Sequence, residues 1–413
     1  MEETAKRPLA ASRYRWVICG LLFVATGINY VDRQMIGLLK PTLQTEFGWS
    51  EGSYADIVFW FQAAYAIGYI GFGAVIDRLG ARIGYACAFT IWTIAHILHG
   101  FVHGVMGFGM VRFLLGIGES GNFPAGLKAV AEWFPPEERA LATGIFNAGS
   151  NIGAIVTPLV VPAITLAFGW RAAFIITGVV SFVWLFAWLF FYRLPHRVVR
   201  DQSVSIAPPA KLGWRRVAGM RETWAFAIAK FLTDPVWWLF LFWLPDFLHR
   251  RHGLDLRTFG PPLVVIYVLS DLGSVAGGWL SSRMMRAGLT VNRSRKITML
   301  ICAIAVMPVF AAQYVDSLWA AVAIIGLAAA AHQAWSANLF TLPSDMVPQS
   351  AMGSVIGIGG AAGAVGGMLM AKYTGFVLER FDSYWPIFLV AGSVYLFALL
   401  IIQLLVPDLK IRS

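Results

Sequence analysis

Long apolar stretches separated by short polar segments run through the whole chain. Because each stretch holds about 20 residues or more, it is long enough to cross the hydrocarbon core of a bilayer as a helix. Apolar and polar residues do not alternate with a period of two, so the pattern favours helices over a membrane β-barrel. We predict twelve membrane-spanning helices, at 14–39, 54–76, 83–103, 105–128, 140–168, 172–192, 224–248, 259–282, 295–314, 317–342, 350–378 and 384–406.

The composition agrees with this pattern. Apolar residues make up 58% of the 413 positions and charged residues 13%, and the mean hydropathy is +0.68. Trp and Tyr cluster near the ends of many predicted spans, where amphipathic rings anchor a helix at the membrane interface. The chain is therefore expected to be an all-α membrane protein.

The net charge of +10 comes from basic residues that flank the spans, so it does not indicate a nucleic-acid partner. Most of them fall in alternate connections, which predicts that both termini are cytoplasmic. One predicted outer connection is an exception, since it carries Arg250, Arg251 and Arg257. We expect the excess charge to contact anionic membrane lipid rather than a protein partner, and the protein to be a monomer.

The chain divides at residues 193–222, which are polar and basic and include Pro208-Pro209. Such a segment is typical of a cytoplasmic linker. The sequence thus predicts a six-helix bundle at 1–192, a linker at 193–222 and a second six-helix bundle at 223–413. Two halves of six helices are typical of a transporter with a central cavity and a substrate site between the halves, near the midplane of the membrane.

A glycine-rich signature ends the second predicted span, from Gly73 to Arg82, and Gly80 is expected to turn the chain. It resembles the loop signature of the major facilitator superfamily. The equivalent segment after span eight keeps a glycine and an arginine but lacks the acidic residue. Asp77, Arg78 and Arg82 are candidate gating residues, and an ordinary ion pair at a helix end is the alternative.

Span five carries small residues at close spacing, Gly144, Gly149 and Gly153, which favour tight contact with a neighbouring helix.

Four ionisable residues lie inside apolar spans: Asp32, Arg33, Arg112 and Glu119. Charged groups in hydrocarbon cost several kcal/mol, so they are rare there unless they have a function. The guanidinium groups match a carboxylate ligand, and the two carboxyl groups are candidate proton carriers. Glu119 follows Arg112 by two helical turns, so both project from one face about 10 Å apart. The alternative is internal pairing, of Asp32 with Arg112 or of Glu119 with Arg33, which would only hold the helices in register.

Polar and aromatic residues of both halves suit a hydroxyl-rich ligand. The candidate substrate contacts besides the two arginines are Tyr30, Tyr65, Asn147, Lys230, Trp335 and Asn338. Lys230 is alternatively a partner of Asp234, four residues on. Asp271 is a candidate third proton site, and His332 is more simply a hydrogen-bonded interior residue.

The sequence gives no indication of an enzyme, a cofactor or a metal site. Gly116 to Gly121 resembles a dinucleotide fingerprint, but it lies inside a predicted membrane helix without a preceding strand. No Walker motif and no spacing typical of metal ligands is present.

Two of these segments, Asn29–Arg33 and Arg112–Pro124, resemble the anion:cation symporter family within the major facilitator superfamily. Lys230–Trp238 and His332–Asn338 are similar to segments of bacterial hexuronate transporters, and the resemblance covers nearly the whole chain. It implies substrate contact by Arg33, Tyr65 and Arg112 and protonation of Asp32 and Glu119.

The resemblance implies a proton-coupled symporter that imports hexuronates, such as galacturonate and glucuronate, across the bacterial inner membrane by alternating access. Within the same fold, the alternatives are a symporter of an aldonate or another organic anion, or an anion exchanger. An alternative of another class is a sensor that binds a sugar acid without transporting it.

Overall fold

The computed structural model describes residues 9–193 and 214–410, which are helical with no strand among them. The helices of the N-terminal half are α1 (Leu9–Phe47), α2 (Glu51–Leu98), α3 (Gly104–Glu119), α4 (Asn122–Trp133), α5 (Pro136–Phe168) and α6 (Trp170–Phe191). Those of the C-terminal half are α8 (Trp214–Ala218), α9 (Arg221–His252), α10 (Gly260–Arg286), α11 (Val291–Val306), the 3-10 helix η1 (Met307–Tyr314), α12 (Leu318–Leu339), α13 (Leu342–Met346), α14 (Gln349–Phe381) and α15 (Trp385–Leu405).

The predicted all-α membrane fold is confirmed. Eleven helical segments of the described residues are long and apolar enough to cross a membrane. The predicted span at 105–128 consists of two shorter helices, because a turn at Ser120 and Gly121 separates α3 from α4. Most of the predicted linker, residues 194–213, lies outside the described part, so the proposed domain boundaries stay a prediction.

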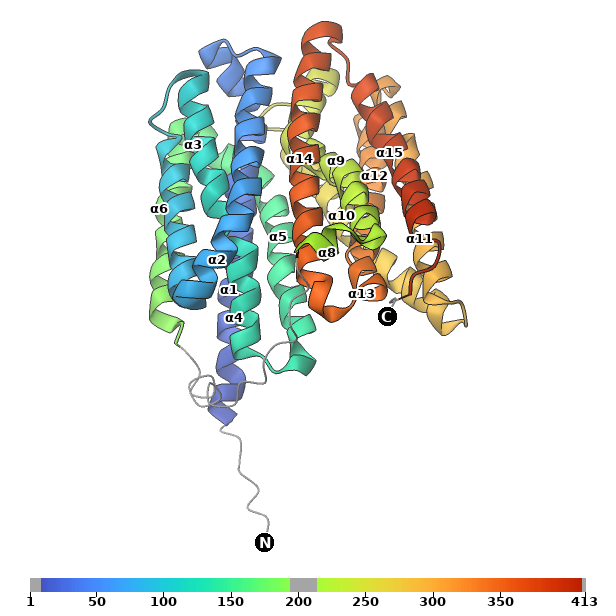
Figure 1. The fold of residues 1–413 in the computed structure, drawn as a ribbon. Coiled ribbons are helices and arrows are strands. Elements are labelled where there is room, and N and C mark those ends of the chain that lie inside the picture. The colour runs from blue at the N-terminus through green and yellow to red at the C-terminus, as the bar shows by residue number, and fades with distance from the viewer. Residues whose placement is uncertain (1–8, 194–213, 411–413) are drawn as a thin grey trace.

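The two halves stand next to each other, with α1 to α6 in one and α8 to α15 in the other (Figure 1). We call the side where the described chain begins the Leu9 side and the opposite side, where α1 ends, the Phe47 side. Gly80 lies on the Leu9 side, within α2, and its φ of 75° and ψ of 166° interrupt the helix there. The continuous helix α2 therefore contains two membrane spans, one on each side of Gly80. The predicted turn at Gly80 is confirmed.

Close backbone contacts hold α5 against α1. A Cβ atom at Gly149 would collide with the carbonyl oxygen of Phe23, and one at Gly153 with that of Gly27. Gly144, on the same helix, has open space around it. Gly149 and Gly153 thus permit the close approach of α1, while Gly144 is not part of this contact.

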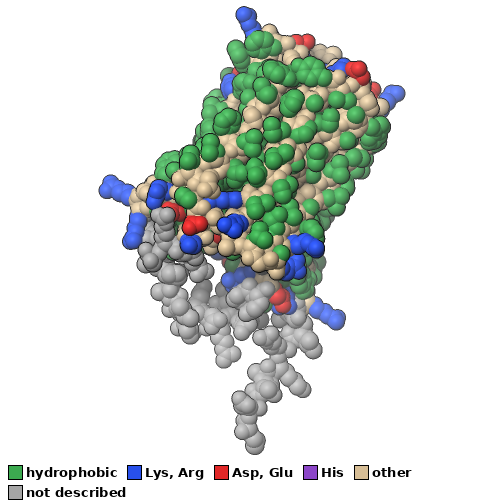
Figure 2. Space-filling model, turned by 90° about the vertical axis from the view of Figure 1, so that its right-hand side faces the viewer, with side chains coloured by type: hydrophobic (Ala, Val, Ile, Leu, Met, Phe, Trp, Pro, Cys, Tyr) green, Lys and Arg blue, Asp and Glu red, His purple; other side chains and the backbone are tan. Residues whose placement is uncertain are grey.

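The flank of the molecule is apolar across its middle. Figure 2 shows hydrophobic side chains covering one flank, with Lys and Arg gathered toward its two ends. Large apolar side chains such as Phe186, Phe397 and Leu404 are more than half exposed. This distribution fits contact with lipid along the flank and with water and headgroups at the ends.

Candidate functional site

Arg33, in the middle of α1, forms a buried ion pair with Glu119, the last residue of α3. Its Nε atom donates to Oε2 of Glu119 at 2.8 Å, and its Nη2 atom donates to Oδ1 of Asn29 at 3.0 Å. The side chains of Arg33 and Glu119 are 3% and 0% exposed. Of the arrangements that the sequence left open, the structure therefore contains the pairing of Glu119 with Arg33.

Aromatic rings surround the Arg33 guanidinium. Its Cζ atom lies 4.9 Å from the ring centre of Tyr65, 5.0 Å from Tyr30 and 5.1 Å from Trp238. Trp238 belongs to α9, so the C-terminal half contributes to this set of rings. Cation–π contacts of this kind stabilise a guanidinium that has left water. Arg33 therefore lies where the two halves meet.

Arg112 of α3 is completely buried and only partly hydrogen-bonded. Its Nη2 atom donates to the backbone carbonyl of Arg33 at 3.0 Å. Its Nε and Nη1 atoms have no hydrogen-bond partner among the described residues. The rings of Phe61 and Phe242 lie 5.3 and 5.9 Å from its Cζ atom. A buried guanidinium with free donors is suited to an anionic ligand.

Asp32, the neighbour of Arg33 in the chain, contacts α2. Its Oδ1 atom lies 3.3 Å from Nε2 of His96, and both side chains are almost completely buried. Neither carboxylate oxygen meets hydrogen-bond geometry with a described residue. His96 was not a candidate from the sequence, because a histidine near the end of an apolar span has no distinguishing spacing.

The other candidate substrate residues do not all lie beside Arg33. Asn147 is exposed on α5, and Lys230 pairs with Asp234 at 2.7 Å. Trp335 donates to the hydroxyl of Thr233 at 3.2 Å inside the C-terminal half. The structure thus brings Tyr30 and Tyr65 together with Arg33, and gives Lys230 and Trp335 partners within their own half.

Asn338, another candidate, contacts the backbone of α10 and α12. Its Nδ2 atom donates to the carbonyls of Gly277 at 3.2 Å and Ala334 at 2.9 Å, and Oδ1 accepts from Arg295 at 3.3 Å. Among the remaining residues, His332 is hydrogen-bonded to Tyr395, as an interior histidine would be, and Asp271 is partly buried.

The candidate gating residues lie on the Leu9 side. The side chain of Asp77 is outside the described part, and Arg78 is exposed. Arg82 donates to the carbonyl of Leu189, and its own carbonyl accepts from Trp188 Nε1 at 3.0 Å. These contacts join α2 to α6 within one half, and the gating role stays a prediction.

A cluster of charged residues joins the halves on the Phe47 side, and the sequence did not identify it. Lys40 Nζ lies 2.7 Å from Oε2 of Glu51 and 2.8 Å from Oδ1 of Asp246. Arg250 Nε lies 2.9 Å from Oδ2 of Asp246, and Nη2 pairs with Glu51. We call these four residues the Phe47-side cluster. Lys40 and Glu51 come from the N-terminal half, and Asp246 and Arg250 come from the C-terminal half.

Further contacts close the same side. The hydroxyl of Tyr384 donates to Asp246, and burial together with the charge of Asp246 raises the pKa of this phenol, which keeps it a donor. Tyr54 donates to the backbone carbonyl of Phe242 at 2.8 Å, and both side chains are buried. Tyr65 and Trp238 remain partly exposed. The halves are therefore closely packed on the Phe47 side of Arg33.

The basic residues that were an exception to the charge pattern are largely accounted for by ion pairs. Arg250 also pairs with Asp382 at 2.6 Å, and Arg251 pairs with Asp316 at 2.5 Å. Their charges are thus neutralised locally.

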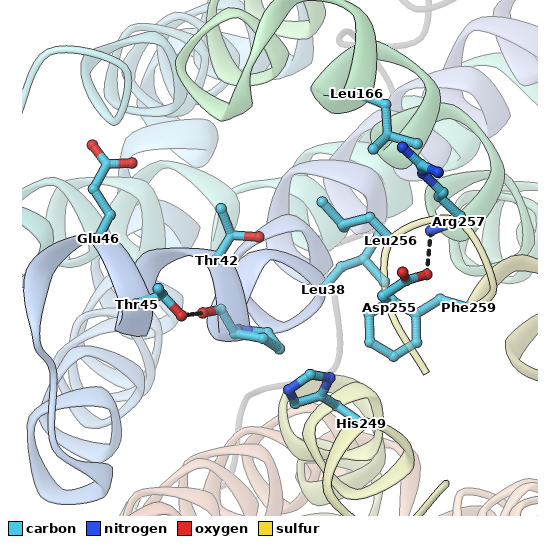
Figure 3. Close-up of a pocket in the computed structure, with 11 residues that line it drawn as sticks. Leu38, Thr42, Thr45, Glu46, Leu166, His249, Asp255, Leu256, Arg257 and Phe259 are labelled. Atoms are coloured by element: carbon cyan, nitrogen blue, oxygen red, sulfur yellow. Dashed lines mark hydrogen bonds between the residues drawn. The ribbon is translucent and has the colours of Figure 1, made fainter. Parts of the chain in front are cut away.

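A groove of about 500 Å³ lies beside the cluster, between α1 and α5 on one side and the end of α9 on the other. Figure 3 shows Thr42 and Thr45 of α1 on one side of it, His249 of α9 on the other, and Arg257 and Asp255 at one end. The backbone N–H of Arg257 and the hydroxyl of Thr258 lower the pKa of Asp255. Asp32, Arg33, Arg112 and Glu119 do not line this groove, so the groove is separate from the site around Arg33.

The described residues contain no group of three or more His, Cys, Asp or Glu side chains that could hold a metal ion.

Comparisons with known proteins agree with this architecture. The sequence profile of the Major Facilitator Superfamily matches residues 22–371. The hexuronate transporter of Escherichia coli (strain K12) is 29% identical over 402 residues, which cover 94% of this chain and 93% of that protein. The galacturonate transporter of Dickeya chrysanthemi is 31% identical over 302 residues, which cover 69% and 87%.

Among solved structures, a bacterial homolog of the human lysosomal transporter Spinster, in an inward-facing and unoccupied conformation, superimposes with a TM-score of 0.69. It is 18% identical, and the match covers 95% of this chain and 96% of that one. At this level of identity the likeness supports the fold.

Proposed function

The chain belongs to the major facilitator superfamily, and on this premise we propose that it is a proton-coupled symporter of sugar acids, with hexuronates such as galacturonate and glucuronate as substrates. It is a multi-pass membrane transporter and not an enzyme. The proposed setting is the bacterial inner membrane, with the Leu9 side and both termini in the cytoplasm. The names of the relatives support the substrate class, and the arrangement of buried charges supports the coupling.

The observation that carries the proposal is the buried ion pair between Arg33 and Glu119. A substrate carboxylate competes with Glu119 for the same guanidinium. Protonation of Glu119 removes its negative charge and leaves the Arg33 donors available to the substrate. Binding of a proton and binding of an anion thus favour each other, which is the requirement for symport.

The surrounding residues suit the rest of a sugar acid. Tyr65 and Trp238 are partly exposed beside Arg33 and offer ring faces and polar atoms to a sugar ring. Arg112, with its free donors, provides a second positive group beside the ring of Phe61. Asp32 is the second proposed proton carrier. Access to Arg33 then alternates between the two sides as the halves rock about this site.

Uptake into proteoliposomes tests the proposal. The measurement is the uptake of labelled galacturonate with and without an inward pH gradient. We expect accumulation that depends on the gradient, and none for Arg33→Ala. Arg171→Ala is the matched control, since Arg171 pairs with Glu46 at a half-exposed position, where α6 begins and α1 ends.

The same assay separates the alternatives. Accumulation of an aldonate without accumulation of hexuronates would change the substrate class while keeping the coupling. Exchange of internal for external anion that ignores the pH gradient would indicate an exchanger. Binding without any uptake would indicate a sensor. An absence of gradient-dependent uptake for every sugar acid would reject the proposal.

A further inference from the structure

A histidine of another helix lies beside Asp32, whose other charged neighbours are Glu119 and Arg112 of α3. His96 lies near the end of α2, and its Nε2 atom is 3.3 Å from Oδ1 of Asp32. The exposed fractions of the two residues are 0% for His96 and 1% for Asp32. An imidazole that faces a buried carboxyl group can give a proton to it or take one from it.

The hydrogen bonds around His96 favour one tautomer of its neutral ring. Thr177 of α6 donates its hydroxyl to the carbonyl of Ala173 at 2.7 Å, so its oxygen accepts from His96. His96 Nε2 lies 2.8 Å from that oxygen. We therefore assign the proton of the neutral ring to Nε2, the atom that also faces Asp32. Its Nδ1 atom has a free lone pair and no hydrogen-bond partner among the described residues.

The remaining neighbours of His96 come from three directions. Arg112 of α3 contributes a positive charge. Phe174 of α6 packs against the imidazole with 5.2 Å between ring centres. The ring of His99, the residue directly after α2, has its centre 6.2 Å from that of His96, toward the Phe47 side. His99 donates from Nδ1 to the carbonyl of Ala95 at 2.8 Å. His96 thus has the carboxyl group of Asp32 near Nε2 and an unpartnered proton-accepting nitrogen at Nδ1.

We propose that His96 relays protons to and from Asp32, a role that rests on the proposed proton coupling. A proton that binds at Nδ1 makes the ring an imidazolium. The proton on Nε2 then moves to Oδ1 of Asp32, which becomes a neutral carboxylic acid. The ring is left neutral with its proton on Nδ1, so one proton has entered and one has reached Asp32. The same steps in reverse return the proton.

This route differs from the one open to Glu119. Glu119 is held by Arg33 at the junction of the halves, next to the partly exposed rings of Tyr65 and Trp238. Asp32 and His96 instead lie between α1, α2 and α6 inside the N-terminal half. In the proposed relay, the proton of Asp32 passes through an imidazole and that of Glu119 does not, although the two carboxyl groups are close enough to influence each other.

The test is His96→Gln, because the glutamine amide can still donate to Thr177 but cannot take up and release a proton. We expect gradient-driven uptake of galacturonate to fall by roughly tenfold or more. The loss is expected to be greatest at high external pH, where direct protonation of Asp32 is slowest. Counterflow at equal pH on both sides is expected to keep the wild-type rate. Gradient-driven uptake with the wild-type rate and pH profile would overturn the relay.

His99→Gln is the matched control, since His99, the residue directly after α2, is equally buried and bonds to the backbone. It is expected to keep the wild-type pH profile, and the same pH effect in both variants would overturn the specific role of His96. Infrared difference spectra of the wild-type protein on acidification need no His96 variant. We expect a ring band that changes with the histidine tautomer, together with a carboxyl band that Asp32→Asn removes. A carboxyl band without any ring band would also overturn the relay.

The relay and the proposed function fail in different ways. If Asp32→Asn abolishes proton-driven uptake and His96→Gln does not change it, the relay is wrong and the symport stands. If wild-type uptake ignores the pH gradient, the proposed function itself is wrong.

Discussion

Lys40 of α1 and Asp246 of α9 form a buried ion pair that joins the two halves, with 2.8 Å between Nζ and Oδ1. The exposed fractions of the two side chains are 0% and 2%. The rings of Trp243 and Tyr54 lie 4.6 and 5.1 Å from the same ammonium group. Because removal of one partner of a buried pair leaves the other charge poorly compensated, this contact is sensitive to mutation.

Lys40→Met is expected to weaken the closure of the Phe47 side. Asp246 would keep Arg250 as a partner, so we expect a cost of about 1–3 kcal/mol rather than the full cost of an unpaired buried charge. The measurement is the distance distribution between spin labels at Thr45 and Arg257, exposed residues of the two halves that both line the groove in Figure 3. It requires a background in which Cys87, the exposed one of the three free cysteines, is replaced by Ser.

We expect a larger fraction of long distances in Lys40→Met than in the wild type. Arg251→Ala is the control, because Arg251 pairs with Asp316 inside the C-terminal half and not across the junction. An unchanged distribution in Lys40→Met would contradict a role of this ion pair in closure.

Glu119→Gln is expected to abolish proton-driven uptake, because the amide cannot carry a proton and does not compete as an anion for Arg33. Counterflow of galacturonate is expected to persist, since it needs no net proton movement. The measurement compares the two modes in proteoliposomes. Full proton coupling in this variant would remove Glu119 from the mechanism.

Arg33→Lys is expected to weaken substrate binding although the charge is kept. A lysine cannot present the planar fork that a carboxylate accepts, and it loses one of the bonds to Glu119 or Asn29. A charge-assisted hydrogen bond contributes roughly 1.5–3 kcal/mol, so we expect affinity to fall by roughly 10- to 100-fold. Calorimetric titration with galacturonate measures it, and wild-type affinity would exclude fork-like recognition at this position.

Gly149→Ala is expected to destabilise the protein, while Gly144→Ala is not. A methyl group at Gly149 would press on the backbone of Phe23 in α1, and crowding of this kind costs about 1–3 kcal/mol. Gly144 has nothing within 4 Å of an added Cβ atom, so alanine there is neutral or slightly stabilising through its higher helix propensity. Thermal unfolding in detergent compares the two, and equal melting temperatures would contradict the close approach of α1 and α5.

The helical fold was predictable because long apolar stretches have few alternatives in a membrane. The four buried charges near Arg33 were identifiable for the same reason, since they interrupt apolar spans. Their partners were not, because helix spacing fixes which residues share a face but not which helix lies opposite. The sequence thus left two pairings open, and only the packing of α3 against the rest of the half selects Glu119 with Arg33.

The residues that sequence reasoning missed have a common reason. Lys40, Glu51 and Asp246 lie toward the ends of predicted spans. Charged residues are common there, so their presence does not indicate a functional site. Their significance depends on a contact between α1 and α9, helices far apart in the chain. Asn338 is the opposite kind of residue, one that the sequence singled out as a substrate contact. In the structure it contacts Arg295 and backbone carbonyls instead.

The Phe47-side cluster also consists of two separately neutral pairs. Lys40 and Glu51 belong to the same half, as do Asp246 and Arg250, and each pair is in direct contact. When the halves part, each half keeps one cation and one anion together, and no ion has to enter water or lipid alone. The contact between the halves is then an attraction between two dipoles, which is strong at short range and fades quickly with distance. A contact of this kind stabilises the closed state, and the halves can still separate and re-form it without a large electrostatic cost.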